Sequence, residues 1–477
     1  MNALGCLAVS LLFQTSAAGA QAVPPPATAQ AVSSPAGAQA VPPPASAQNQ
    51  SKAQAVSQTP PPLVRLPLPP PAARGTGGKL DPAAATRAYL DLLPTEQRER
   101  SNSYFEGGYW LILVDFLWTA GVALLLLHTG FSARMRDRAE RMVRSPRGQI
   151  LLYWAQFVTV ITLLTLPLEL YRGYFREHRY GLSNLTLGAW LGEQGKGFVL
   201  FLLLGGLTVM TLYTLVRRLG ERWWIWGTLV TILFFAAGAL IAPVLIVPLF
   251  NSPHLLQDAR VVAPILSLAR ANGIPANEVW EVDASKQSTR VSANVSGFLG
   301  TERVTLNDNL LARCSLPEIE SVMGHEMGHY VLNHVYKFLV LIGLVILVGF
   351  ALLNALFERL RQRNQQRWQV RGLGDTAGMP LAMLLLSAYF LLLTPVTNSI
   401  IRIQEYEADI FGLNASQQPD GFAQTSLKLS EYRKLEPGPL EELVFFDHPS
   451  GHTRILSAMR WKAEHPEVWD AALSGGR

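Results

Sequence analysis

Gly324-His325-Glu326-Met327-Gly328-His329 is the stretch around which the rest of the chain can be interpreted. It has the pattern H-E-x-x-H, and on a helix its two histidines lie four residues apart on the same face. Both imidazoles can therefore bind one metal ion, with Glu326 beside it to take a proton from a water that the metal activates. A chance H-E-x-x-H on a solvated helix surface is the simpler alternative, so the setting of the motif matters.

The residues before the motif predict that it lies on a helix. Ser315 and Glu318 have the spacing of a capping box, with Ser315 at the N-cap and Glu318 at N3. Apolar side chains then recur at helical spacing, at Ile319, Val322, Met323 and Tyr330.

A third ligand is needed, because catalytic zinc centres use three protein ligands. The segment Glu405-Tyr406-Glu407-Ala408-Asp409 follows the last apolar stretch of the chain and offers Glu405. Asp409 lies one turn later on the same face, where it can accept a hydrogen bond from a ligating histidine and fix its tautomer. Glu407 points to another face and is expected to be solvated. Without the H-E-x-x-H, an ordinary charged helix start would explain this segment equally well.

The chemistry of peptide hydrolysis then assigns further roles. Glu326 would pass the water proton to the leaving amine. A second donor is needed for the developing oxyanion, and His448 and Arg454 in the C-terminal tail are candidates. For His448 alone, a solvated loop histidine is the simpler explanation. His334 and His452 are interpreted as structural or solvated.

Composition indicates a membrane protein. The chain has 477 residues, of which 49% are apolar and only 16% charged. The net charge of +5 comes with no basic stripe interleaved with aromatics, so no nucleic-acid partner is expected. Cys6 and Cys314 are the only cysteines, which excludes a cysteine-rich zinc site.

Six apolar stretches have close to the ~20 residues that a bilayer requires, and they predict a mainly α, polytopic membrane protein. The predicted spans are Trp110–Leu127, Ile150–Leu170, Phe198–Val216, Ile225–Leu249, Phe338–Phe357 and Pro380–Ile401.

The chain divides into six regions. We expect a signal peptide or N-terminal anchor, a disordered Pro/Ala/Gln-rich tether with Ala-Gln-Ala-Val repeats, a membrane region with four spans, a soluble insert with an edge strand and the H-E-x-x-H helix, two further spans, and a C-terminal helical part of the catalytic domain. Their bounds are 1–20, 21–79, 80–250, 251–337, 338–401 and 402–477. Smaller elements are expected as helices over 80–105 and 258–272 and strands over 279–282 and 303–306.

Arginines in three loops predict the orientation. The loops after spans one, three and five contain fourteen arginines and should be cytoplasmic. The insert and the tail would then lie outside the cytoplasm, an arrangement that a signal peptide fits. The N-terminal segments look bacterial, so we expect a multi-pass protein of the bacterial inner membrane.

Over roughly residues 100–460 the chain resembles the type I CAAX prenyl endopeptidases, integral-membrane zinc metallopeptidases of the gluzincin group. The resemblance rests on ordered blocks: Ile241-Ala242-Pro243 with Pro248–Asn251, Ser292-Ala293-Asn294 with Gly297-Phe298, Arg303–Leu306 with Asp308, Gly324–His329 with Asn333-His334, Arg402 with Glu405, Ala408 and Asp409, and His448-Pro449 with Arg454.

The resemblance implies a barrel of membrane helices around a large chamber, capped by a small α+β gluzincin-type zinc domain. It also implies one Zn²⁺ per chain and roles for individual residues. These are zinc ligation by His325, His329 and Glu405, general base catalysis by Glu326, supporting contacts from Asp409 and Arg402, substrate binding by strand addition at Asn294, Gly297 and Phe298, and substrate or oxyanion contacts from His448 and Arg454.

The chain departs from this family in three respects. Members that process prenylated proteins have seven spans, whereas six are predicted here. Val295 stands where the family usually has an aromatic residue, so the substrate groove would differ. Eukaryotic members have the zinc domain in the cytosol, whereas the arginine-rich loops predict the opposite side.

The sequence therefore predicts a membrane-embedded zinc metalloendopeptidase that acts on peptides or membrane-associated proteins, not necessarily prenylated ones. A catalytically inactive scaffold or holdase with the same fold is the alternative, and the intact set of ligands and Glu326 argues against it. A transporter would need more ionisable residues within the spans than Asp115 and Glu169. The natural substrate and the oligomeric state do not follow from the sequence.

Overall fold

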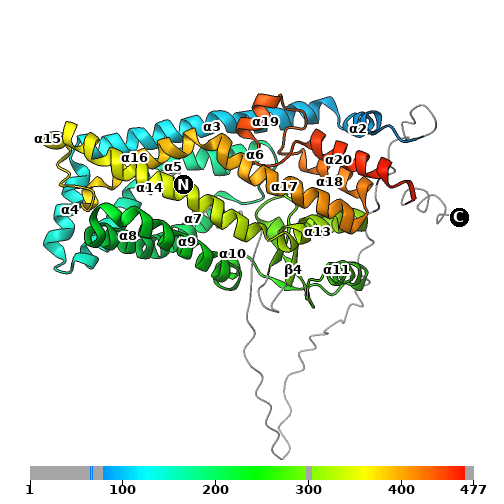
Figure 1. Ribbon diagram of the computed structural model, residues 1–477, viewed down its shortest axis with the longest axis horizontal. Helices are drawn as coiled ribbons and strands as arrows, with labels where there is room; N and C mark the ends of the chain where they lie inside the picture. The colour runs from blue at the N-terminus through cyan, green and yellow to red at the C-terminus, as the bar shows by residue number, and fades with distance from the viewer. Residues whose placement is uncertain (1–64, 66, 68–78, 297–302, 468–477) are drawn as a thin grey trace, which may run out of the picture.

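The computed structural model describes residues 65, 67, 79–296 and 303–467. It is mainly helical, with one small sheet (Figure 1). Long helices run through the molecule, with α4 and α15 at one end and the shorter helices and the sheet at the other. The expected signal segment 1–20, all but three residues of the expected tether 21–79, and Gly297 and Phe298 lie outside the described residues.

The N-terminal half is helical, and single π-helical turns interrupt it at three places. Its elements are α2 (Pro82–Leu90), α3 (Thr95–His128), α4 (Phe131–Met142), α5 (Pro146–Leu170), η1 (Tyr171–Phe175), α6 (Arg176–Arg179), α7 (Leu187–Leu200), η2 (Phe201–Gly205), α8 (Gly206–Leu219), η3 (Gly220–Arg222), α9 (Trp223–Ile241), η4 (Ala242–Ile246) and α10 (Val247–Phe250). The expected single helix over 80–105 is wrong. It is divided between α2 and α3, because Pro94 lacks an amide hydrogen and disfavours a helical conformation at the preceding residue.

The C-terminal half begins with the sheet domain. Its elements are β1 (His254–Leu255), α11 (Ala259–Ala271), β2 (Val279–Val282), η5 (Ala284–Lys286), β3 (Ala293–Ser296), β4 (Arg303–Asn307), α12 (Asp308–Arg313), α13 (Leu316–Val331), α14 (His334–Arg363), α15 (Gln365–Trp368), η6 (Thr376–Gly378), α16 (Met379–Leu392), α17 (Thr394–Ser416), α18 (Pro419–Leu429), α19 (Pro439–Phe445) and α20 (Gly451–Glu464). The expected helix over 258–272 and the two expected strands are confirmed as α11, β2 and β4.

The sheet has the strand order β1-β2-β4-β3. β2 and β4 are parallel, and the outer strands β1 and β3 are antiparallel to their neighbours. Val304 and Leu306, two residues apart on β4, share one face of the sheet and pack in a buried core with Ile265 of α11 and Met323 of α13. The sheet therefore supports the helix that carries the H-E-x-x-H motif, and β3 lies at its edge, as predicted.

Within the described residues, four helical runs are long and apolar enough to cross a membrane: Thr95–His128, Pro146–Arg179, Leu187–Phe250 and His334–Arg363. The pair α16 and α17, which bend by 57° where the sequence analysis expects one continuous span, counts as a fifth crossing only if the two helices form one broken span. Pro395 in the first turn of α17 explains this break, since it cannot donate a backbone hydrogen bond to the preceding turn.

The run Leu187–Phe250 contains two of the predicted spans. Gly220 has a φ of 53°, which glycine adopts readily, and the chain reverses there so that α8 and α9 lie side by side (Figure 1). The total of six spans remains a prediction, because length and composition alone support four or five helices.

The membrane helices enclose a cavity of about 1130 Å³. Aromatic and aliphatic side chains form most of its wall, among them Trp154, Phe235 and Phe350 from three different helices. At one end the lining reaches Asn294 on the edge strand β3. The predicted fold class, a barrel of membrane helices with a small α+β domain, is therefore confirmed.

Candidate metal centre

Two helices that cross at very close range build the site. α13 begins with the predicted capping box, in which Glu318 accepts a hydrogen bond of 2.7 Å from the Ser315 backbone amide. α17 lies against the middle of α13, where both helices have glycine. A Cβ atom at Gly412 would lie only 2.7 Å from the His325 backbone nitrogen, and one at Gly324 only 2.9 Å from the Gly412 carbonyl oxygen. The absence of side chains at these positions lets α17 bring Glu405 to the histidines.

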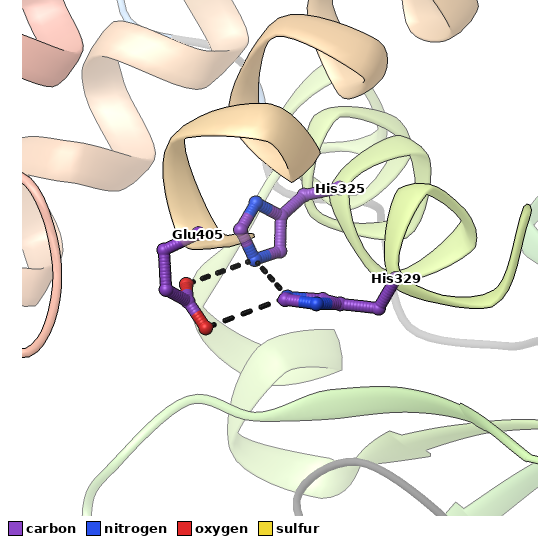
Figure 2. A group of neighbouring side chains, drawn as sticks. All are labelled: His325, His329 and Glu405. Atoms are coloured by element: carbon purple, nitrogen blue, oxygen red, sulfur yellow. Dashed lines mark hydrogen bonds and ion pairs between the residues drawn. The ribbon is translucent and has the colours of Figure 1, made fainter. Parts of the chain in front are cut away.

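Two imidazole nitrogens and both carboxylate oxygens of Glu405 converge between the helices (Figure 2). His325 Nε2 is 3.1 Å from His329 Nε2 and 3.3 Å from Glu405 Oε2, and His329 Nε2 is 3.4 Å from Glu405 Oε1. In a tetrahedral zinc site with bonds of ~2.0–2.1 Å, neighbouring ligand atoms are separated by roughly 3.3 Å. The three predicted ligands therefore have the spacing and the donor types that such an ion requires.

Carboxylate and guanidinium groups hold the ligands from behind. His325 Nδ1 is 2.8 Å from Asp409 Oδ1, so the proton of the neutral ring lies on Nδ1 and leaves Nε2 free to bind a metal. Arg454 donates from Nε to Asp409 at 2.9 Å and from Nη2 to Glu405 at 3.2 Å. Both Asp409 and Arg454 are buried. Asp409 therefore lies behind a ligand histidine, as the resemblance implies, and Arg454 compensates two buried carboxylates.

The second ligand is supported by residues to which the sequence analysis gave no such role. His329 Nδ1 lies 2.9 Å from His334 Nδ1, and His334 Nε2 lies 3.0 Å from Glu407. Lys337 donates to the same carboxylate at 2.8 Å. Glu407 lies on a different face from Glu405 and its side chain is 42% exposed, as expected, but it also contacts His334 and Lys337.

A sequence signal for this arrangement exists. Asn333 follows the end of α13 and has a φ of 58°, a left-handed conformation that asparagine tolerates better than most residues. This turn starts α14 at His334 and directs the buried His334 ring back toward His329. An asparagine–histidine pair shortly after an H-E-x-x-H helix is therefore worth testing as a support for the second ligand.

His448 approaches the site from the C-terminal tail. Its Nε2 is 3.2 Å from Glu405 Oε2, and its Nδ1 is 2.8 Å from Asp447 Oδ1. Arg402 lies further away, where it donates to the backbone carbonyls of Glu442 and Phe446 at 2.8 and 2.5 Å. Arg402 therefore fixes the backbone of the segment that precedes His448, and these hydrogen bonds do not involve the metal-ligand residues.

Burial and charge affect the titration of the three motif residues in different ways. Burial disfavours the charged form of His325, but hydrogen bonds to Asp409 and Glu405 outweigh this and raise its pKa to about 10. For His329, burial lowers the pKa to about 3, so its ring is neutral, which is the form that binds a metal. Burial raises the pKa of Glu326 to about 8. A cation at the neighbouring ligands would oppose this rise, because positive charge favours the carboxylate.

The predicted substrate-binding residues are only partly described. Asn294 lies on β3, opposite Thr305 of β4, and its side chain is buried at the end of the large cavity. The ligand residues do not line that cavity within the part of the chain that the structure describes. Substrate binding by Asn294 stays a prediction.

Fold and site together define an integral-membrane metallopeptidase. Comparison with known proteins agrees: residues 83–252 match the CAAX prenyl protease N-terminal family, described by five membrane helices, and residues 255–462 match peptidase family M48. The uncharacterized metalloprotease YhfN of Bacillus subtilis is 32% identical over 365 residues, which cover 75% of this chain and 85% of that protein. The chain belongs to peptidase family M48 and is a metalloendopeptidase.

Two other similarities extend this result. CAAX prenyl protease 1 of Saccharomyces cerevisiae is 26% identical over 331 residues, 65% of this chain and 72% of the yeast protein. The crystal structure of S. mikatae Ste24p has the same fold, with a TM-score of 0.66, 22% identity, and coverage of 77% of this chain and 90% of that one. Membership of family M48 implies a metal cofactor, and the geometry above identifies the residues that can hold it.

Proposed function

We propose that this protein is a zinc metalloendopeptidase that hydrolyses peptides or membrane-associated proteins. In this proposal His325, His329 and Glu405 hold one Zn²⁺ per chain. The observation that carries it is the convergence of their ligand atoms at 3.1 to 3.4 Å, close to the edge length of a tetrahedral zinc site. Two imidazoles and a carboxylate are also a donor set typical of catalytic zinc.

Each residue around the ligands has a separate role in the proposed mechanism. A bound zinc ion would supply a Lewis acid that activates water and polarises the scissile carbonyl. Glu326 accepts the proton of the attacking water and delivers it to the leaving nitrogen. His448 is the better oxyanion donor of the two predicted candidates. Arg454 already donates to Asp409 and Glu405, so its part is to position the third ligand.

The cavity and the edge strand favour an extended peptide as substrate. A peptide that pairs with β3 near Asn294 would lie between α13 and the wide cavity among the membrane helices. Some relatives are named CAAX prenyl protease, but the expected signal segment and the arginine-rich loops favour exported or membrane proteins as substrates of this chain. We further propose that it resides in the bacterial inner membrane with the metal centre outside the cytoplasm.

The variant Glu326→Gln tests the mechanism. Loss of a general base costs about 10²–10⁴-fold in rate, so we expect kcat to fall by at least about 100-fold while metal content, measured by plasma mass spectrometry, stays at one zinc per chain. Glu320→Gln is the matched control, because Glu320 lies on the same helix and its carboxylate contacts Gln418 instead of the ligands. Purified wild-type protein without zinc, or a Glu326→Gln variant as active as the control, would contradict the proposal and favour the inactive scaffold.

A further inference from the structure

α19 is a short helix that leads directly into Asp447 and His448, and its outer face is apolar. Leu440 is 77% exposed and Leu443 is 47% exposed. Residues three apart on a helix lie on the same face, so the two leucines form one continuous apolar surface. Such a surface in a membrane protein requires an occupant, because nothing in the described part of the chain covers it.

Contacts with α3 place this face at the boundary of the membrane. Phe445 stacks on Tyr109 with ring centroids 3.9 Å apart, and the Tyr109 hydroxyl donates to Glu441 at 2.7 Å. The apolar part of α3 begins at the next residue, Trp110, whose side chain is 70% exposed. Tyrosine and tryptophan are enriched where the hydrocarbon meets the headgroups, so α19 lies at the level of that interface.

Contacts with a second membrane helix, α17, also place α19 at the membrane interface. Asn398 donates through its side-chain amide to the Val444 carbonyl at 2.8 Å, and Arg402 donates to the Glu442 carbonyl at 2.8 Å. Both donors lie on α17 at the end of the predicted span 380–401. Two independent membrane helices therefore place α19 where each of them leaves the bilayer.

The charged residues of α19 face the protein. Glu441 accepts hydrogen bonds from Lys434 at 2.8 Å and from Tyr109, and Glu442 accepts one of 3.0 Å from the Ser450 backbone amide. The helix therefore has its acidic groups engaged on one side and its leucines free on the other. This division is typical of a helix that lies in the plane of a membrane interface.

We infer that α19 lies in the bilayer interface, with Leu440 and Leu443 inserted between the lipid headgroups and the acyl chains. The membrane surface is then the partner that sets the depth of the segment carrying His448. This inference rests on the membrane placement of α3 and α17 and is independent of the identity of the metal.

Spin-label accessibility in vesicles tests this inference. Leu440→Cys is made in a chain with Cys6→Ser and Cys314→Ala, labelled with a nitroxide and reconstituted into phosphatidylethanolamine–phosphatidylglycerol vesicles. Oxygen concentrates in lipid and a nickel chelate stays in water, so their relative collision rates report depth. Leu255→Cys on β1 is the control in water, because Leu255 is a 40% exposed leucine of the sheet domain. Leu344→Cys on α14, 55% exposed, is the control within the bilayer.

We expect the oxygen-to-nickel collision ratio at position 440 to be several-fold higher than at 255 and lower than at 344. A ratio at 440 equal to that at 255 would place the leucines in water and overturn the inference. A label at 440 that is shielded from both probes would overturn it too, because a second protein copy or another segment of the chain would then cover this face.

Discussion

His329 is held through another imidazole. Its Nδ1 lies 2.9 Å from His334, whose other nitrogen lies 3.0 Å from Glu407. His325 instead contacts the Asp409 carboxylate directly at 2.8 Å. Since the partner on the outer nitrogen fixes the tautomer and orientation of a ligating ring, the two histidine ligands depend on different neighbours.

Replacement of His334 should therefore weaken metal binding. For His334→Ala we expect the zinc dissociation constant, measured by competition with a chromophoric chelator, to rise by about 10–100-fold. Glu407→Gln keeps a hydrogen-bond acceptor for His334 and should cause a smaller rise. His452→Ala is the matched control, because His452 lies at the start of α20 and its backbone amide donates to the Leu435 carbonyl. Unchanged affinity in His334→Ala would show that His329 needs no such support.

Cys314 provides a pH-dependent readout of the sheet domain. It is a free, buried thiol, and burial raises its pKa from 9.0 to about 11. Because the folded pKa is raised, the folded state keeps the proton between these two values, and this contribution to stability is complete below pH ~9 and is lost as pH rises toward 11. The thiolate is the reactive form.

In a Cys6→Ser chain, which leaves one thiol, we expect iodoacetamide to modify native Cys314 slowly at pH 8–9 and faster as the pH approaches 11. The urea-unfolded chain serves as the reference and should react with the ordinary pKa of 9.0. Equal rates for the folded and unfolded chains at pH 9, followed by mass spectrometry, would contradict the buried position of this side chain.

At the scale of elements, the metal centre depends on the close crossing of α13 and α17. The ligands come from helices that are separated in sequence by the membrane helix α14 and by α15 and α16. Glycines at positions 324 and 412 allow the backbones to meet, and a Cβ atom at either position would be within 3.0 Å of backbone atoms of the other helix. Main-chain atoms cannot rotate away as a side chain can, so the spacing of the two helices depends on these residues.

Gly412→Ala should therefore push α17 away from α13. Overpacking of this kind costs about 1–3 kcal/mol, so we expect a lower Tm together with weaker zinc binding, since Glu405 moves with its helix. Gly121→Ala on α3 is the matched control, because an added Cβ there meets nothing within 4 Å. A Gly412→Ala protein with the Tm and zinc affinity of this control would show that the close approach is not required.

At the scale of the whole molecule, three arginine-rich loops meet at one end. Arg136 of α4 pairs with Asp375 at 2.6 Å, and Arg217 of α8 donates to the Gly374 carbonyl at 2.9 Å. These contacts join the loops after the first, third and fifth predicted spans. The metal centre on α13 and α17 lies toward the other end of the helices (Figure 1). The loops and the centre are therefore expected on opposite sides of the membrane.

Reporter fusions test on which side of the membrane the metal centre lies. We expect alkaline phosphatase fused after Arg477 to be active, because the tail would be outside the cytoplasm, and the same enzyme inserted into the loop at 143–147 to be inactive. Comparable expression of both fusions, checked by immunoblot, is the control. The reverse pattern of activity would place the metal centre in the cytoplasm and refute the predicted orientation.

The sequence by itself determined the local features of this protein. Hydrophobic runs predict membrane helices, the capping box predicts the start of α13, and the i and i+4 spacing predicts that His325 and His329 share a face. Each of these follows from interactions within a few turns of one helix. Glu405 and Asp409 could also be predicted, because their spacing on one helix suits a ligand and its support, and because a known family shows the same ordered motifs.

Only the tertiary structure decided which distant groups meet. The contact of His334 with Glu407 joins positions 73 residues apart, and the contacts of Arg454 with two carboxylates depend on how α20 packs against α17. The exposed face of α19 likewise arises from packing between helices that are remote in sequence. Local patterns carry no information on such distances, because the same helix can pack at many angles until its neighbours are in place.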